Sequence, residues 1–318
     1  MEQPLISICI PAYKNANYIV RLLDSIRIQT FRDFEVVICD DSPDDQLEEI
    51  VDRYQKDFGI LYQRNFKALG SPANWNRSIE LAQGQWIKIM HDDDWFTRSD
   101  SLLKFVKAAN ESNCDFIFSG FINFNLTSSV EQKHLVSKKN LVRLRNNPLY
   151  LFRTNYIGHP STTLIRNKNV VWFDEYLKWV VDIEFYIRVL NKNKEFFYIP
   201  ELLVNIGESD DQITKSVFRN PIVEIPENLY LLNKIGVTAL RNIYVFDYYW
   251  RLIRNLGFRN ISDVLSFNRD SLNVPIVFNQ ILFVQSKFSL KLLKIGVISK
   301  TLMFFTWFYN FLKSTYSR

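Results

Sequence analysis

The stretch Ile6-Ser7-Ile8-Cys9-Ile10-Pro11-Ala12-Tyr13-Lys14-Asn15 begins as an almost uninterrupted apolar run and ends in polar residues. Such a run predicts a strand that is buried on both faces, as strands of parallel sheets are. The residues after it have helical spacing, with one apolar face made by Ile19, Leu22, Leu23 and Ile26. A buried strand followed directly by an amphipathic helix is typical of the start of an α/β fold.

The same alternation of strands and helices continues over the first 120 residues. Strands are also predicted at 34–39, 60–63, 86–90 and 114–120, and helices at 15–28, 46–58, 73–82 and 101–110. This pattern predicts a Rossmann-like, mostly parallel, doubly wound sheet. Ligands bind at the carboxyl ends of the strands in such sheets, so the residues that follow each strand are the first candidates for a site.

The pattern changes twice further along the chain. It becomes mixed after about residue 140, where we expect helices at 148–154 and 181–190 and strands at 162–166 and 195–199. Beyond Pro221 the sequence reads as helical and aromatic, without further alternation. We therefore predict one α/β domain over residues 1–220 and a helical, aromatic-rich region over residues 221–318.

Composition excludes several classes of protein. Of the 318 residues 47% are hydrophobic and 23% are charged, which argues against a disordered, collagen-like or polytopic membrane protein. The net charge of +5 is too small to indicate a nucleic-acid partner. Cys9 and Cys39 lie in apolar runs, so we expect them to be buried free thiols; together with Cys114 they indicate a reducing, cytoplasmic setting. We expect no export signal in the N-terminal residues.

Residues 288–316 are dense in large apolar and aromatic side chains, with lysines spaced along them. The stretch from 301 to 312, which contains no charged residue, is too short to span a bilayer, which needs about 20 residues. Two interpretations stay open. The segment forms a helix in the membrane interface, with its lysines toward anionic headgroups, or it packs on the domain or on a second subunit of an oligomer.

Acidic residues follow two of the predicted strands. Asp40 and Asp41 come after the second strand, and Asp92, Asp93 and Asp94 come after the fourth. A compact acidic triplet repels itself unless a cation is present, and Mg²⁺ and Mn²⁺ bind one or two carboxylates together with substrate phosphates. We therefore expect a nucleotide diphosphate bridged by a metal ion at this edge, although a turn and a helix N-cap would also account for residues 40–45.

The order of these motifs resembles the family 2 glycosyltransferases, which have the GT-A fold. The resemblance rests on the opening stretch, on Phe34-Glu35-Val36-Val37-Ile38-Cys39-Asp40-Asp41-Ser42, on Asn74-Trp75-Asn76-Arg77-Ser78 and on His91-Asp92-Asp93-Asp94-Trp95. It is strong over residues 5–120 and thins out to about residue 215. It implies a nucleotide-sugar half over about 1–120 and an acceptor half over about 121–220.

The resemblance also implies roles for individual residues. The nucleotide is expected on Pro11, Ala12, Tyr13, Asp40, Asp41, Asn76, Asp92 and Asp93, and Mn²⁺ or Mg²⁺ on Asp92, Asp93 and Asp94. His91 stands where many members carry an aspartate. As a polar residue at a strand end we expect it to face solvent, with a role as a metal ligand as the alternative. Residues 208–214 resemble a loop that closes over the donor, but Gly207 stands near the usual position of a metal-binding histidine, so closure by such a histidine is not expected.

Asp182 stands in the position of the family's catalytic base, at the start of a predicted helix. An inverting transfer needs a base to take the proton of the acceptor hydroxyl. Val181 replaces the glutamate that commonly precedes this aspartate, and helix capping is the alternative role. His159 and Trp95 are expected to contact the acceptor. For His159, contact with the diphosphate and a structural turn are the alternatives.

These residues imply a metal-dependent, inverting glycosyltransferase that moves a sugar from a UDP- or dTDP-sugar to a saccharide acceptor. A lipid-linked acceptor at the inner face of the cell membrane would explain the C-terminal region and indicate surface polysaccharide biosynthesis. One alternative is a sugar-nucleotide nucleotidyltransferase, which usually has a Gly-rich loop where Pro11–Asn15 stands. The other is a non-catalytic, membrane-docked scaffold of the same fold, against which the intact Asp92–Asp94 and Asp182 argue.

Overall fold

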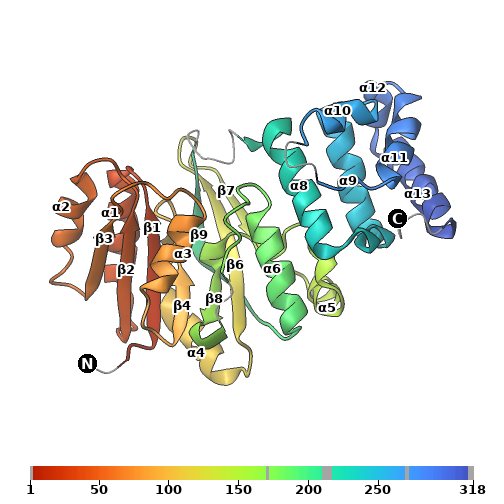
Figure 1. Ribbon diagram of the computed structural model, residues 1–318. Coiled ribbons are helices and arrows are strands. Elements are labelled where there is room, and N and C mark those ends of the chain that lie inside the picture. The colour runs from red at the N-terminus through yellow and green to blue at the C-terminus, as the bar shows by residue number, and fades with distance from the viewer. Residues whose placement is uncertain (1–2, 170–171, 210–216, 269–271, 314–318) are drawn as a thin grey trace. The chain divides into compact units, whose positions relative to one another are not determined.

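The computed structural model describes residues 3–169, 172–209, 217–268 and 272–313 (Figure 1). Within these residues a nine-stranded sheet has the strand order β3-β2-β1-β4-β8-β6-β9-β5, and β7 pairs with β6. The strands are β1 (Ile6–Ala12), β2 (Phe34–Asp40), β3 (Ile60–Arg64), β4 (Trp86–Ile89), β5 (Trp95–Phe96), β6 (Phe116–Asn125), β7 (Glu131–His134), β8 (Thr163–Arg166) and β9 (Phe197–Glu208).

Helices connect the strands and make up most of the later part of the chain. The α-helices are α1 (Ala16–Arg27), α2 (Gln46–Asp52), α3 (Ala73–Glu80), α4 (Ser101–Glu111), α5 (Lys138–Asn146), α6 (Val181–Lys192), α8 (Pro221–Ile235), α9 (Ile243–Leu256), α10 (Ile261–Leu265), α11 (Val277–Ser286), α12 (Leu290–Leu293) and α13 (Gly296–Leu312). The 3₁₀ helices are η1 (Pro148–Phe152), η2 (Pro160–Thr162), η3 (Asn167–Asn169) and η4 (Val237–Arg241). Within the described part of the chain, no helix has the length and hydropathy of a membrane span.

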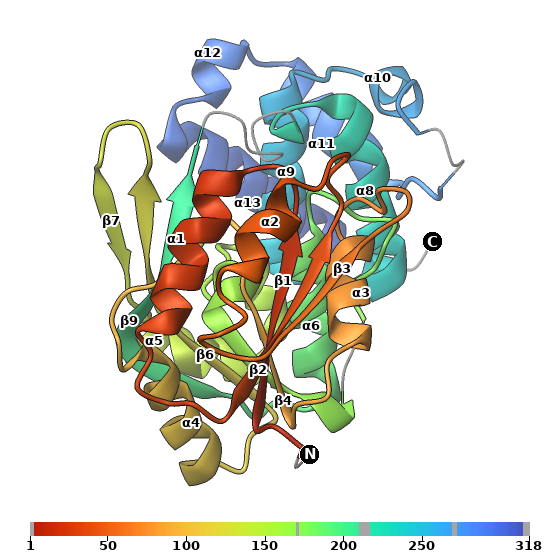
Figure 2. The same cartoon turned by 90° about the vertical axis from the view of Figure 1, so that its left-hand side faces the viewer.

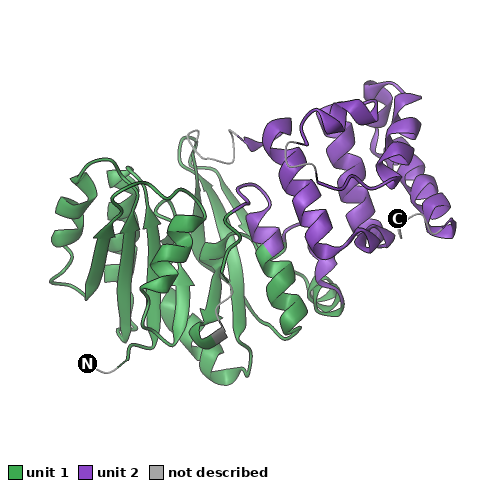
Figure 3. Ribbon diagram, viewed as in Figure 1, with its two compact units in different colours: residues 1–146, 156–175, 185–211 green, residues 147–155, 176–184, 212–318 purple. Residues whose placement is uncertain are grey.

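The chain divides into two compact units (Figure 3). The first unit contains the sheet and comprises residues 1–146, 156–175 and 185–211. The second unit is helical and comprises residues 147–155, 176–184 and 212–318. The second unit thus includes two short internal segments, 147–155 and 176–184, in addition to the C-terminal helices. The domain boundary that we predict at residue 221 stays a prediction.

The parallel strands β3, β2, β1 and β4 form one side of the sheet. The register pairs Ile6 with Phe34 at the start of β1 and β2, and Ala12 with Asp40 at their ends. Figure 2 shows α1 and α2 on one side of these strands and α3 on the other. Because each strand lies between two layers of helices, β1 and β2 are buried along almost their whole length, as the apolar runs predict.

The predicted α/β sheet and the helical C-terminal region are confirmed, and so is the burial of Cys9 and Cys39, which are free thiols. The sheet is mixed rather than mostly parallel, because β8 pairs antiparallel with both β4 and β6. The structure adds β5 and β7, which are short and lack a buried apolar run. The helix predicted at 148–154 is the shorter η1, whose first turn is capped by the side chain of Asn147.

Gly84 lies where a loop touches the main chain of β1. Its N–H donates to Ser7 Oγ at 2.7 Å, and a Cβ built on it would lie 2.5 Å from Ser7 N and 2.7 Å from Ile6 C. Because backbone atoms cannot give way cheaply, we predict that Gly84→Ala lowers the free energy of unfolding by about 1–3 kcal/mol. Urea unfolding measures this loss. Gly59→Ala is the matched control, since no atom lies within 4 Å of its Cβ position, and equal stability of both variants would contradict this account.

Candidate active site

Hydrogen bonds hold the carboxyl ends of β1, β2 and β4 together. Tyr13 N donates to Asp92 Oδ2 at 3.0 Å, which ties the end of β1 to the residues after β4. Lys14 N donates to Ser42 Oγ at 2.7 Å, which ties it to the residues after β2. The structure therefore brings the predicted nucleotide segment at Tyr13 and the first residue of the acidic triplet into direct contact.

Both aspartates at the carboxyl end of β2 accept hydrogen bonds from within the fold. Asp40 is fully buried, and its two oxygens accept from Ser42 N and from the hydroxyl of Tyr62, each at 2.7 Å. Asp41 accepts from Leu69 N at 3.0 Å and from Gly70 N at 2.8 Å. Asp40 thus braces the turn after its own strand, while Asp41 anchors the loop before α3 beside the strand ends.

Two asparagines of α3 have different surroundings. Asn76, a predicted nucleotide ligand, donates to Phe173 O at 2.9 Å and accepts from Phe173 N at 2.9 Å, so its amide braces the chain around Phe173. Asn74 instead donates to Cys39 O at 2.9 Å, at the end of β2, and accepts from Asn65 at 2.9 Å. Sequence reasoning missed Asn74, although its place in the same quoted motif is a signal that could have found it.

The residues after β4 form a cluster that can hold a metal ion. The ligand atoms of His91, Asp93 and Asp94 lie within 4.8 Å of one another. Asp94 Oδ2 and His91 Nε2 are buried and have no hydrogen-bond partner among the described residues. Two carboxylates and one imidazole are a suitable donor set for Mn²⁺ and an acceptable one for Mg²⁺. We expect Asp92 as the third ligand, but the cluster contains His91 instead. The side chain of Asp92 accepts a hydrogen bond from Tyr13 N.

His91 does not face solvent as we expect from the sequence. Its side chain is 18% exposed, and its ring centroid lies 4.5 Å from that of Trp75 on α3. Burial is the main factor that lowers the pKa of His91, to about 3. The imidazole is therefore neutral at physiological pH, which is the form that binds a metal ion.

Burial and mutual repulsion also dominate the titration of the carboxylates. Loss of solvent and the neighbouring charge of Asp93 raise the pKa of both Asp92 and Asp94. Hydrogen bonds act in the opposite direction, and one of them comes from Gly207 N, which donates to Asp94 Oδ1 at 3.1 Å. A divalent cation would compete with protons for carboxylates in such a site.

Lys88 is a fully buried cation on β4. Its Nζ donates to the main-chain oxygen of Ser161 in η2 and lies 4.9 Å from the centroid of the Phe105 ring. Burial lowers the pKa of Lys88 to about 7, and the negative charge of Asp94 opposes this shift. Ser161 Oγ in turn accepts from His91 N at 3.0 Å, so Lys88 and Ser161 link η2 to the start of the acidic triplet.

The other side of the triplet packs against α1 and β9. Arg21 Nη2 donates to Asp93 O at 2.7 Å, and its guanidinium carbon lies 3.9 Å from the centroid of the Trp95 ring. A Cβ on Gly207 would lie 2.3 Å from Asp93 O, so only glycine lets β9 approach this closely. Trp95, which we expect at the acceptor, is stacked on Arg21, and its acceptor role stays a prediction.

His159 caps η2 and lies near the other two histidines of the chain. Burial lowers the pKa of His159 to about 4, and the proximity of His134 adds to this shift. The Phe121 ring contacts both His134 and His159, with ring centroids 4.6 Å and 6.3 Å away, respectively. His159 is thus a neutral residue in an aromatic setting, and its predicted contact with the acceptor stays a prediction.

Asp182 is the second residue of α6 and belongs to the second compact unit, whereas the acidic triplet belongs to the first. Its Oδ1 is buried and has no hydrogen-bond partner among the described residues. Burial raises the pKa of Asp182 to about 7. A carboxylate with this pKa accepts a proton readily near neutral pH, as a general base must.

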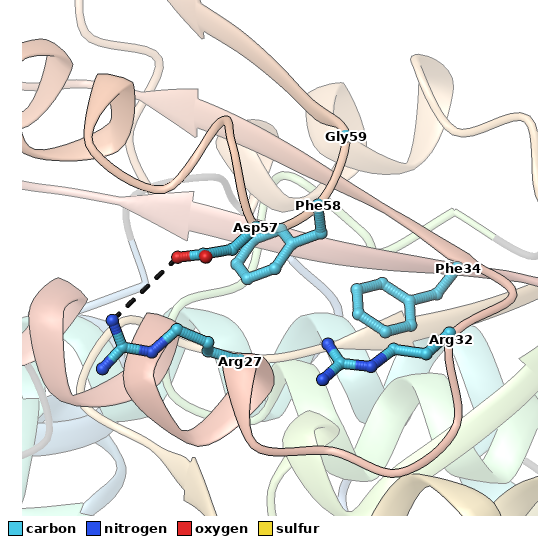
Figure 4. Close-up of a pocket in the computed structure, with 6 residues that line it drawn as sticks. All are labelled: Arg27, Arg32, Phe34, Asp57, Phe58 and Gly59. Carbon is cyan, nitrogen blue, oxygen red and sulfur yellow. Dashed lines mark ion pairs between the residues drawn. The ribbon is translucent and has the colours of Figure 1, made fainter.

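A cavity of about 400 Å³ lies at the opposite ends of the strands (Figure 4). It is bounded by residues near the end of α1 and the starts of β2 and β3, namely Arg27, Arg32, Phe34, Asp57, Phe58 and Gly59. Arg27 and Asp57 form an ion pair of 4.0 Å there, drawn as a dashed line in Figure 4. Because Phe34 begins β2 and Asp40 ends it, this cavity is separate from the acidic cluster.

Solved structures with the same fold are glycosyltransferases. Residues 1–349 of TarS from S. aureus, in complex with UDP-GlcNAc, align with a TM-score of 0.60 and 17% identity over 98% of this chain and 93% of TarS 1–349. The mannosyltransferase PcManGT from Pyrobaculum calidifontis, in complex with GDP-Man and Mn²⁺, aligns with a TM-score of 0.55 and 13% identity, covering 98% of this chain and 88% of that one. The fold of the chain is therefore GT-A, with a helical C-terminal region.

Sequence comparison identifies the family. The model of glycosyl transferase family 2 matches residues 7–171, just over half of the 318-residue chain. An uncharacterized glycosyltransferase of Methanocaldococcus jannaschii is 25% identical over 256 residues, 79% of this chain and 81% of the relative. The abequosyltransferase RfbV of Salmonella typhimurium is 38% identical over 102 residues, 31% of this chain and 30% of the relative. The chain belongs to glycosyl transferase family 2 and is a glycosyltransferase.

The acidic cluster generates a prediction about metal binding. Mn²⁺ together with UDP is expected to raise the melting temperature by several degrees, and by more at about pH 8 than at about pH 6, because protons compete for the same carboxylates at the lower pH. Differential scanning fluorimetry measures both shifts. Asp93→Asn should abolish the Mn²⁺-dependent part of the shift, and Asp52→Asn, an exposed aspartate of α2, should keep it. An equal Mn²⁺ effect in both variants would refute the proposed ligand set.

Proposed function

We propose that the chain is a metal-dependent, inverting glycosyltransferase that moves a sugar from a UDP- or dTDP-sugar to a saccharide acceptor. The observation that carries this proposal is the convergence of His91, Asp93 and Asp94 at the edge where β1, β2 and β4 end. The site offers donors for a cation, and the exposed side chain of Tyr13, whose N–H is bonded to Asp92, lies beside them for a nucleotide. The retained acidic residues favour catalysis over a non-catalytic scaffold.

The nucleotide is proposed to lie on the segment Pro11–Tyr13 and on the loops that Asp40 and Asp41 hold. Asp41 fixes Leu69 N and Gly70 N, and Asp92 fixes Tyr13 N, so these loops are ordered before a ligand arrives. Such preorganisation lowers the entropic cost of binding. The UDP-GlcNAc bound by TarS, a protein with the same fold, supports a UDP-sugar as the donor.

Mn²⁺ or Mg²⁺ is proposed to bind His91, Asp93 and Asp94. The ion would neutralise the negative charge that develops on the departing diphosphate. The protein's own part is to hold the two carboxylates: Gly207 N–H orients Asp94, and Arg21 fixes the main-chain oxygen of Asp93. Mn²⁺ in PcManGT, which has the same fold, supports this choice of cation.

Asp182 is proposed to take the proton of the acceptor hydroxyl as that oxygen attacks the anomeric carbon. Its raised pKa and its buried oxygen without a hydrogen-bond partner suit a base that must accept a proton and release it again. His159 and Trp95 are proposed to contact the acceptor sugar. Inversion follows when the attack comes from the face opposite the leaving diphosphate.

The acceptor is proposed to be a saccharide carried on a lipid at the inner face of the cell membrane, as in surface polysaccharide biosynthesis. The related RfbV of Salmonella typhimurium is an abequosyltransferase, which supports transfer of a sugar by this chain. Contact with the membrane would come from residues 288–316 and would keep the enzyme beside such an acceptor. We propose a cytoplasmic enzyme that is peripheral to the membrane.

Release of UDP or dTDP from a panel of nucleotide sugars tests the proposal directly. We expect one sugar nucleotide to be turned over in the presence of Mn²⁺ and not after chelation with EDTA. Asp182→Asn should reduce turnover by at least about 100-fold, the usual contribution of general base catalysis, with little change in UDP affinity. Asp52→Asn is the control. UDP binding without turnover of any donor by the wild-type chain would favour the scaffold instead.

The titration of Asp182 predicts the pH dependence of the reaction. Only the ionised carboxylate can accept a proton, so kcat should rise with pH through an apparent pKa of about 7. A pH series at saturating donor, acceptor and Mn²⁺ measures this profile. If kcat is already constant down to about pH 5, where the carboxylate of this pKa would be protonated, Asp182 is not the base.

A further inference from the structure

Helix α13 in the second unit has an inverted distribution of polar and apolar residues. The buried side chains of this helix are Ser299, Met303, Thr306 and Asn310, which recur every three or four residues and so share one face. Three of these four are polar, and Asn310 is fully buried. A surface helix of a globular protein normally buries its apolar face and exposes its polar one.

The buried polar groups of α13 are satisfied within the second unit. Ser299 Oγ accepts from Trp250 Nε1 at 3.0 Å and from Arg254 Nη1 at 3.1 Å, both on α9. Thr306 and Asn310 donate to main-chain oxygens one turn earlier in α13. The Ser299 bonds fix the start of α13 against α9, and the bonds of Thr306 and Asn310 to their own helix help to satisfy these two polar side chains where they are buried.

The opposite face of α13 is aromatic and exposed. Val297 is 78% exposed, Phe305 is 64% exposed and Leu312 is 67% exposed. The residues that share this face are Val297, Phe304, Phe305, Phe308, Tyr309, Phe311 and Leu312. Seven exposed apolar or aromatic residues on one face of a helix mark a surface that another phase or partner covers.

The positive charge near this aromatic face favours an anionic partner. Residues 271–318 contain six lysines and arginines and no aspartate or glutamate. Lys291 and Lys294 of the α12 region are exposed, as are Lys300 and Lys313 at α13. Two copies of such a surface would repel each other, whereas an anionic bilayer would attract the lysines and accept the aromatic rings.

We propose that the aromatic face of α13 inserts into the interface of an anionic membrane, with the surrounding lysines against lipid headgroups. This deepens the proposed membrane contact and names its face, and it does not rest on the transfer reaction. Because α13 buries the face of Ser299, Met303, Thr306 and Asn310 and is bonded to α9 through Ser299, the helix lies flat on the bilayer as part of the folded unit. The partner is therefore a lipid surface that carries net negative charge.

Co-sedimentation of the full-length chain with vesicles tests this inference. We expect binding to phosphatidylcholine vesicles that contain about 30 mol% phosphatidylglycerol, weak binding to phosphatidylcholine alone, and release as salt rises to about 0.5 M. Phe305→Ser with Phe308→Ser should weaken binding by about 100-fold, since burial of each ring contributes about tenfold or more. Lys291→Gln with Lys294→Gln should weaken it by about tenfold.

The control is Leu265→Ser, which removes an exposed apolar residue of α10 in the same unit and should leave vesicle binding unchanged. Sedimentation velocity of the same proteins distinguishes a second copy of the chain as the occupant. A wild-type dimer that becomes monomeric in the double phenylalanine variant, without vesicle binding, would overturn the proposal. UDP and Mn²⁺ thermal shifts of every variant show independently whether the donor site is intact.

Discussion

The main constraint on this structure is the partial or complete burial of three consecutive carboxylates, Asp92, Asp93 and Asp94, which repel one another. The desolvation of Asp92 and Asp94 next to Asp93 raises their pKa, and groups from several elements oppose this cost. Tyr13 N–H comes from the end of β1, Gly207 N–H from β9, and the buried charge of Lys88 from β4. The remaining demand for positive charge is the physical reason for assigning a divalent cation to the site.

The parallel part of the sheet could be predicted from the sequence because its apolar runs have no other stable location than between two layers of helices. The position of Asp92–Asp94 at the edge followed from that prediction. Strands β5 and β7 could not be predicted, because they are short and exist only through pairing with β9 and β6. The burial of His91 against Trp75 depends on packing between β4 and α3, which a pattern along the chain does not encode.

The sequence predicts which residues lie at the site, but it does not predict the hydrogen-bond partners of their side chains. Asp40, Asp41 and Asn76 lie near the strand ends or on α3 as expected. Their side chains, however, also form hydrogen bonds with Tyr62, Leu69 and Phe173 that span 22 to 97 residues of sequence. The same limit applies to α13. Its composition predicts a helix that binds a membrane or a partner. Only the packing of the folded unit shows that polar Ser299, Thr306 and Asn310 are buried while the phenylalanines are exposed.

His91, Asp93 and Asp94 are proposed to hold one divalent cation together with a nucleotide diphosphate. Titration of Mn²⁺ followed by electron paramagnetic resonance measures this directly, because the signal of free Mn²⁺ decreases as the ion binds. The account predicts one Mn²⁺ per chain in the presence of UDP, with affinity at least about tenfold lower in Asp93→Asn, which removes one charged ligand. Unchanged Mn²⁺ affinity in that variant, or no binding by the wild-type chain with UDP, would contradict it.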